Sequence, residues 1–209
     1  MTNKSSEKLT ISYSVGQEIQ RVQSTLKKLS WYEEHGYRPH LPGGIMASSK
    51  EADVIEAVQR EYSETDYVGS AARLLDEWKS LPDGFEKMRK EPSLHLADKY
   101  EIVLTKYGVG GSYNPELNQV IIKINTTAQV SRIAVVVHEI VHMCIQQLID
   151  HYHVEHWRKE RLVDLLMERY FPGIKKPQDI KEDVSVVDQA FEKYFPNIEQ
   201  VAQSIGIMK

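Results

Sequence analysis

Two histidines and a glutamate interrupt an apolar stretch in the second half of the chain. Residues 135–144 read VVVHEIVHMC, which places His138, Glu139 and His142 among valines, an isoleucine and a methionine. Burial of such groups without partners costs free energy. Because His138 and His142 are four residues apart, a helix would place both imidazoles on one face, one turn apart. The stretch therefore predicts a buried site at which these groups bind a ligand or one another.

The order of these residues, His-Glu-x-x-His, is typical of a zinc site. Two imidazole nitrogens one turn apart can bind one zinc ion in tetrahedral geometry. Glu139 lies one position further round the helix, where it could reach a zinc-bound water as a general base without binding the metal. The alternative is a pair of core histidines that form hydrogen bonds with Glu139 or with the backbone and bind no metal.

The His-Glu-x-x-His helix cannot supply every ligand. A catalytic zinc usually has three protein ligands and one position open to water. The segment that follows the helix contains the candidates for the third ligand, which are His151, His153, Glu155, His156, Glu160 and Asp164.

The two halves of this region together resemble the gluzincins, zinc peptidases built like thermolysin and the zinc aminopeptidases. HEIVH at 138–142 is followed by a second expected helix that carries ERLVD at 160–164. In gluzincins the third ligand is a glutamate on the helix after the active-site helix, often within Glu-x-x-x-Asp. The resemblance, which covers residues 100–164, implies that Glu160 is the third zinc ligand and that Asp164 bonds a ligand histidine. Such a carboxylate fixes the tautomer of the imidazole and raises its basicity.

The resemblance also implies a fold and a reaction. Zincins place an antiparallel edge strand before the active-site helix, and VIIKIN at 120–125 is in that position. An extended peptide substrate would add to this edge as a further strand. The expected reaction is hydrolysis of a peptide bond by a zinc-bound water, with Glu139 as general base. The oxyanion would need one further donor, often Tyr or His, and the candidates are Tyr152, His153, Tyr113 and Tyr170.

Other zinc-peptidase patterns fit the chain less well. SprT-like proteases take the third ligand from a histidine after the active-site helix, and His153 with Trp157, or His156 alone, is loosely similar, although the glycine of that pattern is absent. Metzincins need a histidine where this chain has Leu148, and the cysteine motif of peptide deformylase is missing. Cys144 is expected to be a small buried residue.

Apolar periodicity predicts a mostly helical chain. Helices are expected over 15–34, over 66–80, over 84–90, from Thr126 or Thr127 to about Ile149, over about 154–170, and twice within 177–209 on either side of Pro196; a further helix is expected to begin after a Ser48 or Ser49 cap, with Val54, Ile55 and Val58 on its apolar face.

Two strands are expected between these helices. Alternating residues from Tyr100 to Leu104 and the run at 120–125 predict an antiparallel hairpin with a long connection. The glycines of GVGGSYN at 108–114 are expected to form a turn, with close approach of a substrate backbone as the alternative. The fold class is therefore α+β, with a helical part of unknown role over 1–97 and a zincin-like part over 98–209, or one compact unit of both.

Composition excludes several classes of protein. The chain has 209 residues, 41% hydrophobic content and a net charge of -4, without a dense basic cluster, which argues against nucleic acid as a partner. The longest apolar run, 133–137, is too short for a membrane span. One cysteine and a polar start without an apolar signal segment favour a cytoplasmic protein.

Three functions remain open from the sequence. The first is a zinc metallopeptidase that acts on a peptide or protein substrate. The second is a non-catalytic zinc-binding interaction protein on the same scaffold, which would not need Glu139 as a base. The third is a helical interaction protein whose polar residues form an internal hydrogen-bond cluster. In each case the N-terminal helices could cover the cleft, recruit a protein partner or only stabilise the fold.

Overall fold

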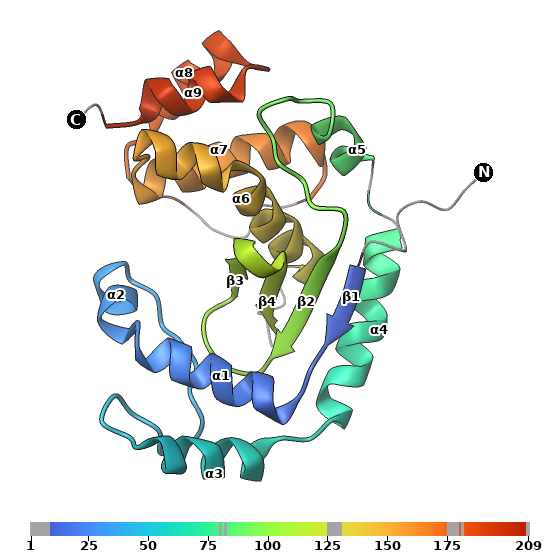
Figure 1. Ribbon diagram of the computed structural model, residues 1–209, viewed down its shortest axis with the longest axis vertical. Helices are drawn as coiled ribbons and strands as arrows, with labels where there is room; N and C mark the ends of the chain where they lie inside the picture. Colours follow the sequence, from blue (N-terminus) through green and yellow to red (C-terminus); the bar gives the residue numbers. More distant parts are fainter. Residues whose placement is uncertain are drawn as a thin grey trace.

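Helices hold 57% of the residues, beside one small mixed sheet (Figure 1). The computed structural model describes residues 9–79, 81, 83–124, 131–174, 180 and 182–207. The predicted α+β, mostly helical class is confirmed. The helices are α1 Val15–Leu26, α2 Leu29–Glu34, α3 Glu51–Glu61, α4 Thr65–Lys79, α5 Gly84–Met88, α6 Arg132–Tyr152, α7 His156–Tyr170, α8 Ser185–Tyr194 and α9 Ile198–Ile205.

Most expected helices form close to their expected positions, with local differences at their ends. The single helix expected over 15–34 is divided into α1 and α2. Helix α3 begins after Lys50, so neither Ser48 nor Ser49 is its cap. The caps expected at Thr126 or Thr127 lie outside the described residues, in which Ser131 precedes α6.

The sheet has four strands in the order β1-β2-β4-β3. Strand β1 runs parallel to β2, β2 runs parallel to β4, and β3 runs antiparallel to β4. Strand β2 is buried along nearly its whole length, whereas β4 alternates between half-buried and buried residues. The bounds are β1 Leu9–Ser12, β2 Tyr100–Thr105, β3 Gly111–Asn114 and β4 Gln119–Lys123.

The predicted antiparallel pairing of the strands at 100–104 and 120–125 is wrong. Strands β2 and β4 are parallel, with Ile102 opposite Val120. The chain first forms β3 at the outer edge of the sheet, then turns through the short 3-10 helix Pro115–Leu117 and returns as β4 between β2 and β3. Alternation of apolar residues predicts a strand but not its direction. The predicted edge strand is thus internal, and β3 is the edge.

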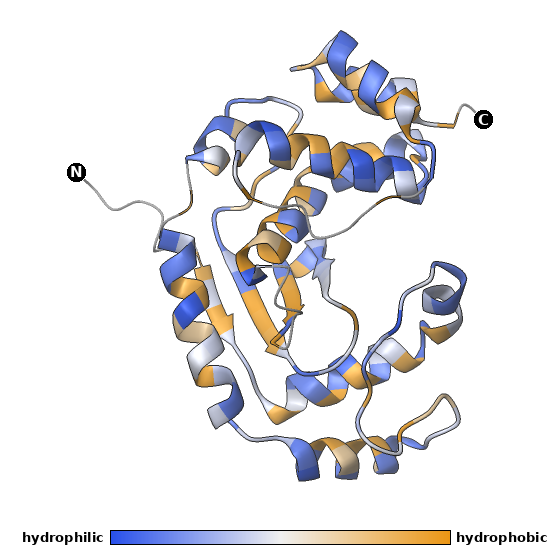
Figure 2. Ribbon diagram, turned by 180° about the vertical axis from the view of Figure 1, so that it is seen from behind, coloured by the Kyte–Doolittle hydropathy of each residue, from blue (hydrophilic) through white to orange (hydrophobic). Residues whose placement is uncertain are grey.

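Helix α6 is the central element of the fold. It packs against β3, β4, α4, α7 and α9, and it contributes the largest share of one continuous apolar core. Figure 2 shows that hydrophobic residues concentrate on the strands of the sheet that it covers. Among the described helices, α6 alone is long and apolar enough to cross a membrane, but most of it is buried inside the protein.

The N-terminal helices cover the other end of the sheet (Figure 1). Helix α1 packs on α3 and β2, with a small apolar cluster of Val22, Val54, Val58 and Tyr107 between them. Strand β1 and helix α4 join the main core beside α6. The short helix α2 follows α1 and carries residues to the mouth of the site described below.

Candidate metal centre

Two histidines of α6 and one glutamate of α7 converge on one point in the buried interior. The Nε2 atoms of His138 and His142 are 3.0 Å apart, and each lies 3.2 Å from Oε2 of Glu160. All three side chains are buried. Because the three ligand atoms lie within 4.8 Å of one another, this group can hold a metal ion. The fold therefore brings Glu160 to the two histidines of the His-Glu-x-x-His motif.

The short link between α6 and α7 produces this arrangement. Residue His153 ends α6 in the left-handed conformation, with φ 52, and α7 begins at His156. The chain therefore turns back at once, and α7 packs along α6. Glu160 lies one turn into α7, on the buried face that looks toward the two histidines.

Glu139 packs against the edge strand. A Cβ atom at Gly111 of β3 would collide with Oε1 of Glu139 and with the side chain of Val135. Only glycine at this position permits α6 to approach β3 so closely. The sequence predicts a turn here, with approach of a substrate backbone as the alternative, and neither expectation includes this contact with a glutamate side chain. Glu139 is thus held beside the metal ligands without being one of the three converging groups.

The electrostatics of the site follow from its burial. Burial lowers the pKa of His142 to about 3, so its imidazole is neutral at pH 7, which is the form that binds metals. Burial raises the pKa of Glu139 to about 7. Glu160 is also buried, but the two adjacent imidazoles hold the pKa of its carboxyl well below the usual range.

Two further predicted residues lie next to the cluster. Asp164 is fully buried one turn beyond Glu160, and its charge acts on His138, which is the neighbourhood expected of a carboxylate that orients a ligand. The ring of Tyr113 stacks on His142 with centroids 5.2 Å apart. Its hydroxyl donates to Oε1 of Gln146 at 2.6 Å.

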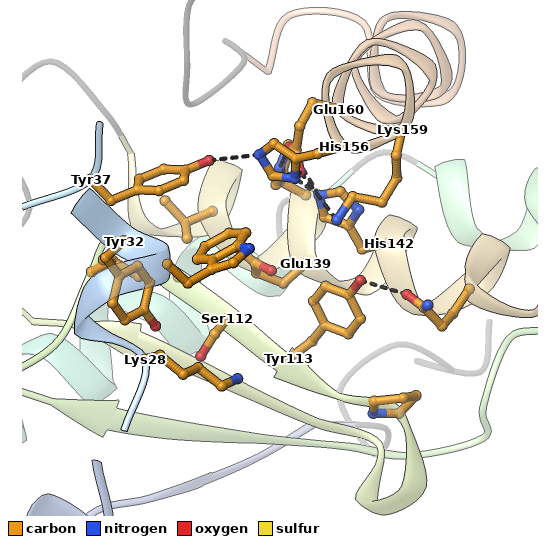
Figure 3. A pocket seen from close by; sticks show the side chains of 18 of the residues that line it. Lys28, Tyr32, Tyr37, Ser112, Tyr113, Glu139, His142, His156, Lys159 and Glu160 are labelled. Atoms are coloured by element: carbon orange, nitrogen blue, oxygen red, sulfur yellow. Dashed lines mark hydrogen bonds and ion pairs between the residues drawn. The ribbon is translucent and has the colours of Figure 1, made fainter. Parts of the chain in front are cut away.

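A cavity of about 930 Å³ opens onto the cluster. Figure 3 shows Glu139, His142 and Glu160 beside it, with Tyr113 on one side and Tyr32 on the other. Strand β3 and the 3-10 turn line one wall, α6 and α7 line another, and the α1–α2 junction lines a third. A substrate-sized molecule can therefore reach the carboxylate of Glu139 and the ligand atoms together.

An aromatic cluster closes one end of this cavity. Tyr37, in the loop after α2, bonds through its hydroxyl to Nε2 of His156 at 3.3 Å (Figure 3). Trp31 stacks on Tyr37 and meets the edge of His156. Tyr37 and Trp31 are absent from the predicted site residues, since no sequence pattern relates them to a motif more than a hundred residues away.

The remaining candidate residues lie outside the converging group. Nδ1 of His156 is 3.8 Å from Oε1 of Glu160, whereas His138 and His142 contact the other carboxylate oxygen, Oε2. His151 and His153 are exposed and do not line the cavity. Nor does Tyr152, which bonds to Glu199 of α9, and Tyr170 is buried in the main core.

Comparison with known proteins found no family model that matches the sequence, and no similar curated protein or solved structure.

Proposed function

We propose that this protein is a zinc-dependent metallopeptidase of gluzincin type. The observation that carries the proposal is the convergence of His138, His142 and Glu160 beside Glu139 at the wall of a large cavity. A structural zinc is usually enclosed by four protein ligands, whereas a catalytic zinc has three and an open position. The described residues provide three ligands, and the cavity leads to them.

The donor set fits zinc. Two imidazole nitrogens and one carboxylate oxygen form a common ligand set of catalytic zinc. Tetrahedral coordination with bonds of about 2.0–2.1 Å separates neighbouring ligand atoms by about 3.3 Å. The observed separations are 3.0 Å and 3.2 Å. Hydrogen bonding alone gives a weaker account of the group, because two imidazoles and one carboxylate oxygen point at each other rather than at separate partners.

Bound zinc would supply a Lewis acid that acidifies water and polarises the carbonyl of a substrate. Glu139 takes a proton from water within the cavity as the carbonyl carbon is attacked, and it returns that proton to the departing nitrogen. Its contact with Gly111 fixes where the carboxylate lies. The exposed edge of β3 lies along the same wall, so an extended peptide can pair with it there.

The test of this proposal separates the metal from the chemistry. Wild-type protein loaded with zinc should hydrolyse members of a mixed peptide library, as read by mass spectrometry. Glu139→Gln should keep about one zinc per chain and lose activity by roughly 10²–10⁴-fold, the usual contribution of a general base. His153→Ala is the matched control outside the cavity and should keep both zinc and activity. Zinc retained without any hydrolysis by the wild type would favour the non-catalytic zinc-binding protein.

A further inference from the structure

The cavity carries a charge opposite to that of the protein as a whole. The chain has a net charge of -4. The cavity lining nevertheless contains Lys27, Lys28, Lys123 and Lys159, against the carboxylates of Glu139, Asp150 and Glu160. A bound divalent ion would add two further positive charges. The mouth of the site is therefore a positive region on an acidic protein, and such a region concentrates anionic ligands.

Three of these four lysines form no ion pair with a carboxylate in the described part of the chain. Lys159 forms an ion pair with Glu160, since its ammonium lies 3.3 Å from Oε1 of that carboxylate. Lys27, Lys28 and Lys123 form no ion pair with a described residue. Their charge is not used to hold the fold together, and it faces the cavity.

The charges are also distributed unevenly. Lys27 and Lys28 lie at the α1–α2 junction, and Figure 3 shows Lys28 on the same side of the cavity as Tyr32, with Tyr113 on the other side. The acidic residue Asp150 is on α6, about two turns beyond His142, where it accepts from Gln146 at 2.7 Å. The α1–α2 end of the cavity thus holds two lysines beside Trp31 and Tyr32. At the other end Asp150 and Gln146 lie with Tyr113, whose ring Lys159 overlies.

We propose that the cavity selects acidic peptides, and that Lys27 and Lys28 bind aspartate or glutamate side chains of the substrate at the α1–α2 end. The proposal rests on the peptidase function and names its substrate class. A peptide is favoured over a nucleic acid because the net negative charge of the chain repels a long polyanion, while a few carboxylates near Glu139 need only a local positive patch. Each pair adds little, because ion pairs between exposed groups are weak.

The test measures binding apart from hydrolysis. The full chain carrying Glu139→Gln and loaded with zinc is titrated, by fluorescence anisotropy, into three dansyl-labelled, amidated octapeptides that alternate alanine with Asp, Asn or Lys. The Asp peptide should bind about 3–10-fold more tightly than the Asn peptide, as two or three weak ion pairs imply, and the Lys peptide should bind most weakly. The preference should shrink in 0.5 M salt because the lysines are screened.

Charge reversal locates the effect. Lys27→Glu with Lys28→Glu should remove the preference for Asp over Asn. The matched control is Lys87→Glu with Lys90→Glu, which changes the net charge equally on exposed residues outside the cavity, and it should preserve the preference. Equal binding of the Asp and Asn peptides, no binding of any peptide, an equal loss in the control, or displacement by oligothymidine as effective as by the Asp peptide would each overturn the inference.

The same experiment distinguishes this inference from the proposed function. If zinc-loaded wild type cleaves the Asn and Asp peptides at equal rates, the peptidase stands and the acidic selectivity fails. If the Asp peptide binds selectively and the wild type cleaves none of the three, the anionic site stands and the peptidase fails.

Discussion

Two helices of this protein bury charged side chains against the same strand, and they do so in different ways. Helix α1 buries Glu18 and Arg21, and helix α6 buries Glu139 with its two histidines. Strand β3 lies between them, with Ser112 bonded to Arg21 and Gly111 against Glu139. The first cluster joins elements of the fold, whereas the second contains groups that could hold a metal ion.

The α1 cluster finds its partners in distant parts of the chain, largely in the backbone. Oε1 of Glu18 accepts from the hydroxyl of Tyr67 and from the backbone N–H of Lys106. Arg21 donates to the hydroxyl of Ser112 at 2.7 Å and to backbone carbonyls of the β2–β3 connection. These contacts join α1, α4 and the strands, so the cluster stabilises the packing of these elements.

The α6 cluster directs its groups toward one another instead. The Nε2 atoms of His138 and His142 and Oε2 of Glu160 meet at one point, and the bonds that join them run from side chain to side chain. Groups that converge in this way are suited to a cation, whereas groups that spread outward to N–H and C=O partners are suited to hold elements in place. Exchange of single residues in the two clusters should therefore have different consequences.

The largest expected difference concerns the metal. Zinc at about 1,000 times its dissociation constant should raise the free energy of unfolding of the wild type by about 4 kcal/mol. Glu160→Ala should abolish this gain because it removes one of three ligands, while Glu18→Ala should keep it. Zinc content by mass spectrometry and thermal unfolding with and without zinc provide the measurement. A Glu160→Ala protein that retains one zinc per chain would show that the third ligand lies elsewhere.

The next largest effect concerns stability without a change in metal binding. Glu18→Ala leaves the buried hydroxyl of Tyr67 and the N–H of Lys106 without their acceptor, at a cost of about 3 kcal/mol for the two groups. Glu18→Gln keeps an acceptor oxygen and should lose much less. Urea unfolding of the two variants measures the difference in their free energies of unfolding. Equal values would show that the hydrogen bonds to Glu18 do not stabilise the fold.

A smaller effect is expected at the strand between the clusters. Gly111→Ala places a Cβ against Glu139 and Val135, so it should destabilise the protein by about 1–3 kcal/mol and displace the carboxylate of Glu139, the proposed general base. Gly110→Ala is the matched control, because a Cβ there meets open space. Peptidase activity and thermal unfolding are measured for both. If Gly110→Ala lowers activity as much as Gly111→Ala, the contact with Glu139 does not position the carboxylate.

The smallest effect is a dependence of stability on pH. Burial raises the pKa of Glu18 above its ordinary 4.5, so the folded state keeps a proton that the unfolded chain loses. The resulting stabilisation is present at low pH and is lost as the pH rises from about 4.5 through the raised pKa. The stability of the wild type relative to Glu18→Gln should therefore decline over that range in urea titrations. A rising difference would mean that the hydrogen bonds to Glu18 outweigh its burial.

The helices of this protein could be predicted with fair accuracy, and the sheet could not. Apolar periodicity is a property of neighbouring residues, so it predicted a helix around His138 and another around Glu160. The direction of β2 relative to β4 depends on pairing between segments, which alternation does not encode. The chain turns at residues 115–118, after the glycines. Because the glycines at 108–111 themselves predict a turn, the sequence gives no indication of strand β3.

The candidate site likewise contains residues that the sequence indicates and residues that only the tertiary structure brings there. The sequence by itself determined that His138 and His142 share one helix face, and the resemblance to gluzincins implied Glu160 as the third residue, with His151, His153 and His156 still open. The structure brings Glu160 to the two histidines. Only the tertiary structure decided that Gly111 abuts Glu139 and that Tyr37, Lys27 and Lys28 reach the cavity from the N-terminal helices. The physical reason is range: spacing along a helix places side chains within a few turns, whereas contacts across about a hundred residues depend on how the whole chain packs.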